Sequence, residues 1–119
     1  MYYLGIDGCG KYTKLLMLDG NGKVLGRHSG AAADLRYQPA ASVARNIAVL
    51  TREIGKLTNT GIKECGGLCF AAPASLFRAA EEQIAKIFKD MGYGCEVLVV
   101  SVERAALAAK KNGELRMGN

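Results

Sequence analysis

The sequence predicts a single α/β domain, residues 1–119, built on a five-stranded mixed sheet with helices packed on it. Three short β-prone segments separated by turn residues open the chain, as in an antiparallel meander. Helical and extended segments then alternate, which is the order of parallel strands joined by crossover helices. A chain of this length can bury a real core but is short for two domains.

The meander is expected to use residues 2–7, 13–18 and 23–28 as strands. The turn-rich stretch DGNG, residues 19–22, joins the second strand to the third. The segment SGAAAD, residues 29–34, is expected to be a loop.

The clearest helix begins at Pro39, a residue that suits the first turn of a helix. Apolar residues then recur at spacings of four, three, four and three, at Val43, Ile47, Leu50, Ile54 and Leu57. This periodicity predicts one buried stripe over about four turns. The stretch TNTG, residues 58–61, ends the helix.

The second half of the chain alternates between strand and helix. Residues 66–72 and 95–101 are short apolar runs that predict buried strands, and a helix capped by Ser75 and ended by Gly92 lies between them. An alanine-rich third helix is expected over residues 102–113. Right-handed crossovers then make the first, fourth and fifth strands parallel. The expected strand order is 3-2-1-4-5, as in ribonuclease H-like domains.

Composition argues against several classes of function. Half of the residues are hydrophobic and 23% are charged, which is ordinary for a globular domain. The net charge of +5 is spread along the chain, so no nucleic-acid partner is expected. No apolar run reaches the roughly 18 residues that span a bilayer, and no secretion signal opens the chain. The four cysteines are interpreted as thiols of a cytoplasmic protein without a membrane partner.

The stretch GIDGCGKYTK, residues 5–14, has the glycine and lysine spacing of a P-loop. Tyr12 replaces the required Ser or Thr, however, and a strand rather than a helix follows. A glycine turn between two antiparallel strands can still bind phosphate through backbone N–H groups. An acidic residue at the end of the first strand can hold Mg²⁺ through water. Asp7 with Gly8, Gly10 and Thr13 fits that description.

Two catalytic alternatives fail on the residues present. Cys65 and Cys69 would lie about 13 Å apart on a strand, too far to share a metal ion, and the single His28 completes no zinc site. Ribonuclease H chemistry needs several carboxylates around two metal ions, and only Asp7 sits at a suitable strand end. If the first and fourth strands are neighbours, Cys9 and Cys69 come within reach of each other, close enough for an adventitious disulfide.

The stretch YYLGIDGCGKYTKLLMLDGNGKVLG resembles the first phosphate loop of N-acetylglucosamine kinase-like proteins. These are also grouped as BadF/BadG/BcrA/BcrD-type ATPases, within the superfamily of sugar kinases, actin and heat-shock chaperones. Their loop reads Asp-Gly-Gly-Gly-Thr-Lys-Thr, with a second hairpin strand and an (L/V)xDxxG turn behind it. The resemblance covers about residues 2 to 109 and implies the N-terminal lobe of such an ATPase. It implies ATP with Mg²⁺ as cofactor, a metal-facing carboxylate at Asp7, and phosphate-binding residues Asp7, Gly8, Gly10, Lys11 and Thr13.

The chain departs from that family at functional positions. Cys9, Lys11 and Tyr12 stand where the family has Gly, Thr and Lys, and Val102 stands where it usually carries a catalytic Asp. Glu103, one position later, points about 100° away on a helix. No catalytic residue is therefore expected. The chain also ends before a second phosphate loop and a second lobe, so at most a partial ATP site is expected, without catalysis by this chain alone.

A second hypothesis is a stand-alone or engineered lobe that self-associates. The apolar stretches at residues 31–33 and 69–74, together with Val102, lie where a cleft or a second lobe would be. Isologous pairing of such patches would give a homodimer. The residues alone leave both hypotheses open.

Overall fold

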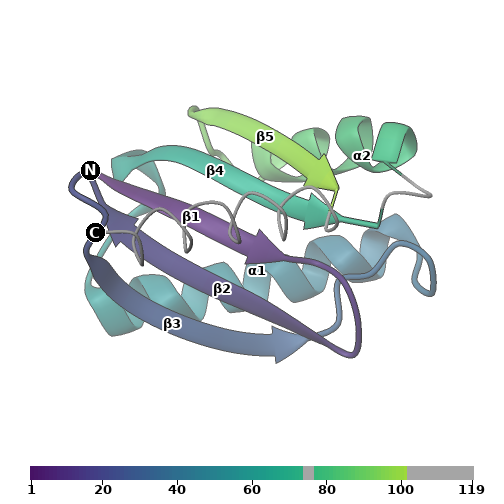
Figure 1. The fold of residues 1–119 in the computed structure, drawn as a ribbon, viewed down its shortest axis with the longest axis horizontal. Helices are drawn as coiled ribbons and strands as arrows, with labels where there is room; N and C mark the ends of the chain where they lie inside the picture. Colours follow the sequence, from purple (N-terminus) through teal and green to yellow (C-terminus); the bar gives the residue numbers. More distant parts are fainter. Residues whose placement is uncertain (74–76, 102–119) are drawn as a thin grey trace, which may run out of the picture.

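The computed structural model describes residues 1–73 and 77–101, which form one five-stranded sheet with two α-helices (Figure 1). The strand order is β3-β2-β1-β4-β5, so the predicted fold class is confirmed. In chain order the elements are β1 (Tyr2–Asp7), β2 (Tyr12–Asp19), β3 (Val24–Ala31), α1 (Ala40–Thr58), a 3₁₀ turn (Ile62–Glu64), β4 (Cys65–Ala72), α2 (Phe77–Asp90) and β5 (Glu96–Ser101).

Strand β1 is the centre of the sheet. It pairs antiparallel with β2 on one side and parallel with β4 on the other. Strand β3 extends the antiparallel half, and β5 extends the parallel half. The direction of the sheet therefore switches at β1, and the carboxyl ends of β1, β4 and β5 lie along one edge (Figure 1).

The core lies between the sheet and the two helices, which cover the same face (Figure 1). Alternate residues of the strands point into it, because successive strand side chains face opposite sides of a sheet. The strand contribution includes Leu4, Ile6, Leu15, Met17, Leu68, Phe70 and Val99. Helix α2 adds Ile84 and Phe88, whose ring meets Tyr93 edge-on at 5.4 Å between ring centroids.

The buried stripe of α1 consists of Val43, Ile47, Leu50 and Ile54. Leu57, predicted as its fifth member, is 70% exposed, so that part of the prediction is wrong. At 100° per residue, the buried residues of α1 lie from about 20° on one side of Val43, at Leu50, to about 80° on the other side, at Thr51. Leu57 lies about 40° from Val43 on the side of Leu50, outside this range. Thr58 lies against Gly26 of β3 instead.

Other differences concern element ends. Residues 29–31 of the predicted loop continue β3, because Ala31 and Gly30 still pair with Tyr12 and Thr13 of β2. Helix α2 ends at Asp90, and Gly92 follows as the predicted glycine stop, with φ of +102°, a conformation that glycine adopts easily. The predicted cap Ser75 and the predicted helix 102–113 lie outside the described residues. Neither α1 nor α2 is long and apolar enough to cross a membrane.

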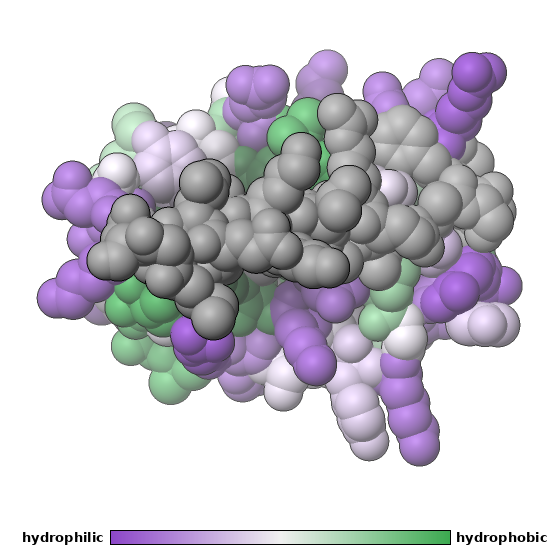
Figure 2. All heavy atoms as spheres, in the orientation of Figure 1, coloured by the Kyte–Doolittle hydropathy of each residue, from purple (hydrophilic) through white to green (hydrophobic). Residues whose placement is uncertain are grey.

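The opposite face of the sheet carries a mixture of side chains. Tyr3, Leu25 and Leu98 are 39%, 42% and 54% exposed, and the charged Lys14 and Arg27 share this face with them. Figure 2 shows this side of the molecule, with hydrophilic side chains around its rim and hydrophobic ones near the start of β3. Among residues 1–73 and 77–101, the buried hydrophobic side chains of the sheet gather on the face that α1 and α2 cover.

We expect Leu50→Ala and Leu57→Ala to separate the buried and exposed sides of α1. Leu50 is 1% exposed, so its truncation should lower the free energy of unfolding by about 2–5 kcal/mol through lost burial and a cavity. Leu57→Ala, at the 70% exposed position of the same helix, should change it by less than about 0.5 kcal/mol. Urea unfolding followed by circular dichroism measures both. Equal losses would contradict the assignment of the stripe.

Candidate functional site

The turn between β1 and β2, residues 8–11, is the candidate site. Asp7, the last residue of β1, is exposed and lies opposite Lys14 of β2 in the antiparallel register. The N–H of Gly8 donates to the carbonyl oxygen of Ala71 in β4 at 2.9 Å, which extends the β1–β4 ladder by one bond. The turn is thus anchored on both neighbouring strands.

Gly8 is required by its contact with the core. A Cβ atom at this position would lie 2.1 Å from Cζ of Phe70, a ring that is 1% exposed. The glycine therefore lets the turn lie directly on the aromatic ring. Its role in the fold is steric, and this contact needs no ligand to explain it.

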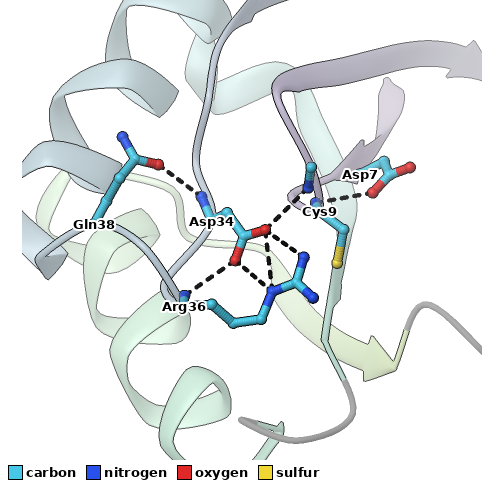
Figure 3. A network of polar contacts seen from close by, with 6 residues as sticks. Asp7, Cys9, Asp34, Arg36 and Gln38 are labelled. Carbon is cyan, nitrogen blue, oxygen red and sulfur yellow. Dashed lines mark hydrogen bonds and ion pairs between the residues drawn. The ribbon is translucent and has the colours of Figure 1, made fainter.

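Two carboxylates hold the turn (Figure 3). The N–H of Cys9 donates to Oδ1 of Asp7 at 3.0 Å, and the N–H of Gly10 donates to Oδ2 of Asp34 at 3.0 Å. Gly10 has φ of +93°, which a residue with a Cβ atom rarely adopts. Two N–H groups of the turn are therefore already satisfied by carboxylate oxygens of the chain itself.

Asp34 is the most connected residue of the site and is only 1% exposed. Besides Gly10, it accepts from the N–H of Arg36 at 3.0 Å and from Nη2 of the same guanidinium at 2.7 Å. Nε of Arg36 lies 3.1 Å from Oδ1, so the contact is bidentate. The backbone N–H of Asp34 donates to Oε1 of Gln38 at 2.9 Å, as Figure 3 shows.

These contacts shift the pKa values of both Asp34 and Arg36. The Arg36 guanidinium, with smaller contributions from the N–H groups of Gly10 and Arg36, lowers the pKa of Asp34, although burial acts in the opposite direction. The same carboxylate raises the pKa of Arg36. Arg36 also lies over the ring of Tyr37, with 5.1 Å from its Cζ atom to the ring centroid. Asp34 and Arg36 are therefore a permanent ion pair at neutral pH.

Sequence reasoning missed Asp34, although a signal was present. The segment DLRYQ, residues 34–38, has the form of a capped turn, because an Asp side chain often accepts the N–H two residues later. Its partner Gly10 lies 24 residues earlier in the chain, and no local pattern connects the two.

The structure brings together four of the five predicted phosphate-binding residues. Asp7, Gly8, Gly10 and Lys11 belong to the turn or border it, and Lys11 is exposed. Thr13 is 1% exposed on the helix-covered face, where its hydroxyl donates to the carbonyl oxygen of Ala31 at 2.8 Å. The Thr13 hydroxyl thus links β2 to β3. Its predicted part in phosphate binding stays a prediction, as do those of the other four.

Metal-binding residues are sparse in this part of the chain. Within residues 1–73 and 77–101, no group of three or more His, Cys, Asp or Glu side chains could hold a metal ion. Asp7 offers one exposed carboxylate, whose Oδ1 also accepts from Cys9. A single carboxylate suits Mg²⁺ that keeps most of its water and takes its other ligands from phosphate oxygens.

Gly8→Ala is expected to destabilise the fold by about 2 kcal/mol or more, because its Cβ would overlap the buried Phe70 ring. Gly5→Ala, three residues earlier in β1, is the matched control, since a Cβ there meets nothing within 4 Å. Its effect should stay within about 0.5 kcal/mol. Chemical denaturation measures both variants. A neutral Gly8→Ala would contradict the steric role of this glycine.

Asp34→Asn should lower the free energy of unfolding at neutral pH by about 1–3 kcal/mol, since an amide cannot accept all the donors of Arg36 and Gly10. The pKa of Asp34 is lower in the folded chain than in the unfolded one. Its carboxylate therefore stabilises the fold fully above the unfolded pKa of about 4, and this contribution is lost as the pH falls through the folded pKa. The difference in free energy of unfolding between the parent chain and Asp34→Asn should therefore shrink below about pH 4, as urea titrations at several pH values would measure. Exposed Asp90→Asn is the control, and a difference independent of pH would argue against the charged role of Asp34.

No protein-family model matches the sequence, and no curated protein matches it either. Solved structures do resemble the fold. The crystal structure of a provisionally assigned N-acetylglucosamine kinase from Chromobacterium violaceum aligns with 84% of this chain at 19% identity, with a TM-score of 0.60. YeaZ from Pseudomonas aeruginosa aligns with 84% of the chain at 14% identity, with a TM-score of 0.55.

The aligned part is 34% of the first protein and 43% of the second, so the chain spans less than half of either. At these identities the likeness concerns the fold. Both proteins have the actin-like ATPase fold. The present chain has the α/β, ribonuclease H-like architecture of one lobe of that fold.

Proposed function

We propose that this chain is the N-terminal lobe of a sugar kinase-like ATPase and supplies part of an ATP phosphate-binding site at the turn 8–11. The observation that carries the proposal is the exposed Asp7 carboxylate at the carboxyl end of β1, beside a glycine turn that Asp34 fixes in place. In open α/β sheets, ligands bind outside the carboxyl ends of the parallel strands. The turn 8–11 follows the carboxyl end of β1, on the edge of the sheet that β1 shares with the carboxyl ends of β4 and β5.

Cations around the turn suit a polyphosphate. Lys11 is exposed on the turn, and Lys14 is exposed beside Asp7 on β2. The side chain of Arg36 is 36% exposed, but its ion pair with Asp34 is neutral overall, so Lys11 and Lys14 supply the net positive charge. A fixed guanidinium needs little reorganisation to meet a phosphate oxygen.

The backbone contributes less than the sequence suggests. The N–H groups of Cys9 and Gly10 donate to Asp7 and Asp34, and the N–H of Gly8 donates to Ala71. These bonds leave little of the predicted N–H nest for an anion. We therefore place phosphate recognition on the cations and on Mg²⁺, which would neutralise the charge between Asp7 and the phosphates.

When bound, Mg²⁺ would supply the positive charge that the acidic end of β1 lacks. Asp7 is the residue that would hold it, through its exposed carboxylate. Arg36 and Lys11 would contact the phosphates as hydrogen-bond donors. Positioning of this kind is most of what a phosphoryl-transfer site requires of its protein, but it needs a base and a nucleotide clamp as well.

We further propose that the chain does not catalyse transfer by itself. The chain corresponds to less than half of either structural neighbour. A superfamily site lies between two lobes, so one lobe would offer half of the contacts. Weak binding without turnover is the expected behaviour.

The residues that suggested the homodimer are partly buried and partly exposed. Ala33, Phe70 and Ala72 lie within the chain's own core at 2% exposure or less, whereas Ala31 is exposed and Cys69 is partly exposed. Val102 and residue 74 lie outside the described part of the chain. Self-association stays a prediction from the sequence.

A magnesium–ATP titration followed by amide NMR shifts tests the proposal. We expect saturable shifts confined to residues 8–11 and their neighbours, with affinity reduced tenfold or more in Asp7→Ala and after removal of Mg²⁺. Asp90→Ala removes an exposed carboxylate far along the chain, on α2, and should bind as the parent does. No shifts, or the same affinity in Asp7→Ala, would refute the phosphate site.

A further inference from the structure

Two cysteine thiols meet at the end of the sheet opposite the candidate phosphate site. The Sγ atoms of Cys65 and Cys95 lie 3.7 Å apart, although the two residues are separated by 30 positions in the sequence. Cys65 is the first residue of β4, and Cys95 directly precedes β5. The pair therefore spans two neighbouring parallel strands and the α2 crossover that joins them.

A β-bulge creates this contact. The pairing of β1 with β4 shifts between Tyr2 and Tyr3, whose partners are Cys65 and Gly67, so Gly66 is an extra residue in β4. The bulge turns Cys65 toward the helix-covered core, where it is buried with Tyr2. Cys69, four residues later, follows the regular alternation and faces the other side of the sheet.

We propose that Cys65 and Cys95 are a site of reversible oxidation. The two thiols form an intramolecular disulfide when a low-molecular-weight disulfide, such as oxidised glutathione, acts as the oxidant. Both thiols are part of one packed cluster, and their sulfur atoms are already in contact. To form the bond, the two sulfur atoms must approach from 3.7 Å to the disulfide length of about 2 Å.

The two thiols take different parts in the exchange. Cys95 is half-buried, whereas burial raises the pKa of Cys65 to about 12. The Cys95 thiolate therefore attacks the glutathione disulfide first, forms a mixed disulfide and releases one glutathione thiolate. The Cys65 sulfur then attacks Sγ of Cys95, which forms the protein disulfide and releases the second glutathione. The two protein thiol protons end on the two glutathione thiolates, so two thiols are oxidised and one disulfide is reduced.

The bond would fasten the edge of the sheet. Strand β5 pairs only with β4 in the described sheet, and the disulfide would close a covalent loop through α2. Such loops restrict the unfolded chain and stabilise the folded one. A reductant-sensitive rise in melting temperature on the order of 10 °C is the expected consequence.

The test is treatment of the folded 119-residue chain with oxidised glutathione, followed by thiol titration, tryptic mapping and thermal melts with and without reductant. We expect the loss of two of the four thiols and a cross-link between the peptides that hold Cys65 and Cys95. Cys95→Ser should lose the cross-link and the reductant-sensitive shift. Cys69→Ser, in β4 with Cys65, is the matched control, and it should retain both the cross-link and the shift.

Cys69→Ser also resolves the mapping, because Lys63 and Arg78 place Cys65 and Cys69 on the same tryptic peptide. A lasting glutathione adduct on Cys95 without a cross-link would overturn the proposal. So would a cross-link through Cys9 or Cys69, or an oxidised protein whose melting temperature does not depend on reductant.

Discussion

The buried carboxylate of Asp34 is the interaction on which the candidate site depends. An uncompensated charge at 1% exposure would be very costly. The Asp34 carboxylate is compensated because it accepts hydrogen bonds from the N–H of Gly10 and from both the backbone and the guanidinium of Arg36. Through these bonds it ties the β1–β2 turn to the segment that leads into α1. The conformation of the turn is thereby set by the chain itself, without a ligand.

This arrangement changes what the turn can do. A glycine turn binds an anion through N–H groups that have no other partner, and those of Cys9 and Gly10 already donate to carboxylates. Two negative charges, on Asp7 and Asp34, also stand beside the place where phosphates would lie. Arg36 neutralises the charge of Asp34, whereas no ion pair to Asp7 occurs among residues 1–73 and 77–101. A divalent cation at Asp7 would balance the other, which is why Mg²⁺ is central to the proposed function.

The fold could be predicted from the sequence because its signals are local and periodic. Alternating strands, one helical stripe and the right-handedness of crossovers are sufficient for the order β3-β2-β1-β4-β5. Leu57 shows the limit of such patterns, since the buried side of α1 extends towards Thr51 and Thr58 and leaves Leu57 at its opposite border. Gly8 was assigned to phosphate binding, whereas its closest constraint is the ring of Phe70, 62 residues later in the chain.

The site residues that sequence reasoning missed depend on contacts between distant segments. Asp34 reaches Gly10 across 24 positions, and Cys95 reaches Cys65 across 30. The thiol pair also depends on the bulge at Gly66, which reverses the face that Cys65 would otherwise share with Cys69. One residue of register decides between a surface thiol and a core thiol, and hydrophobic periodicity does not fix that register at a glycine pair.

The two proposed sites lie at opposite ends of the parallel strands and can act independently. From Cys65 to Ala71, the residue of β4 that accepts from Gly8, an extended strand advances about 20 Å. A disulfide at the first end would restrain β5 and the α2 crossover, but none of its bonded atoms contacts the β1–β2 turn. Coupling between the ends would need a shift of β4 along its length, and the ladders on both of its sides oppose such a shift. Oxidation should therefore change the stability of the lobe while it leaves the geometry around Asp7 and Asp34 in place.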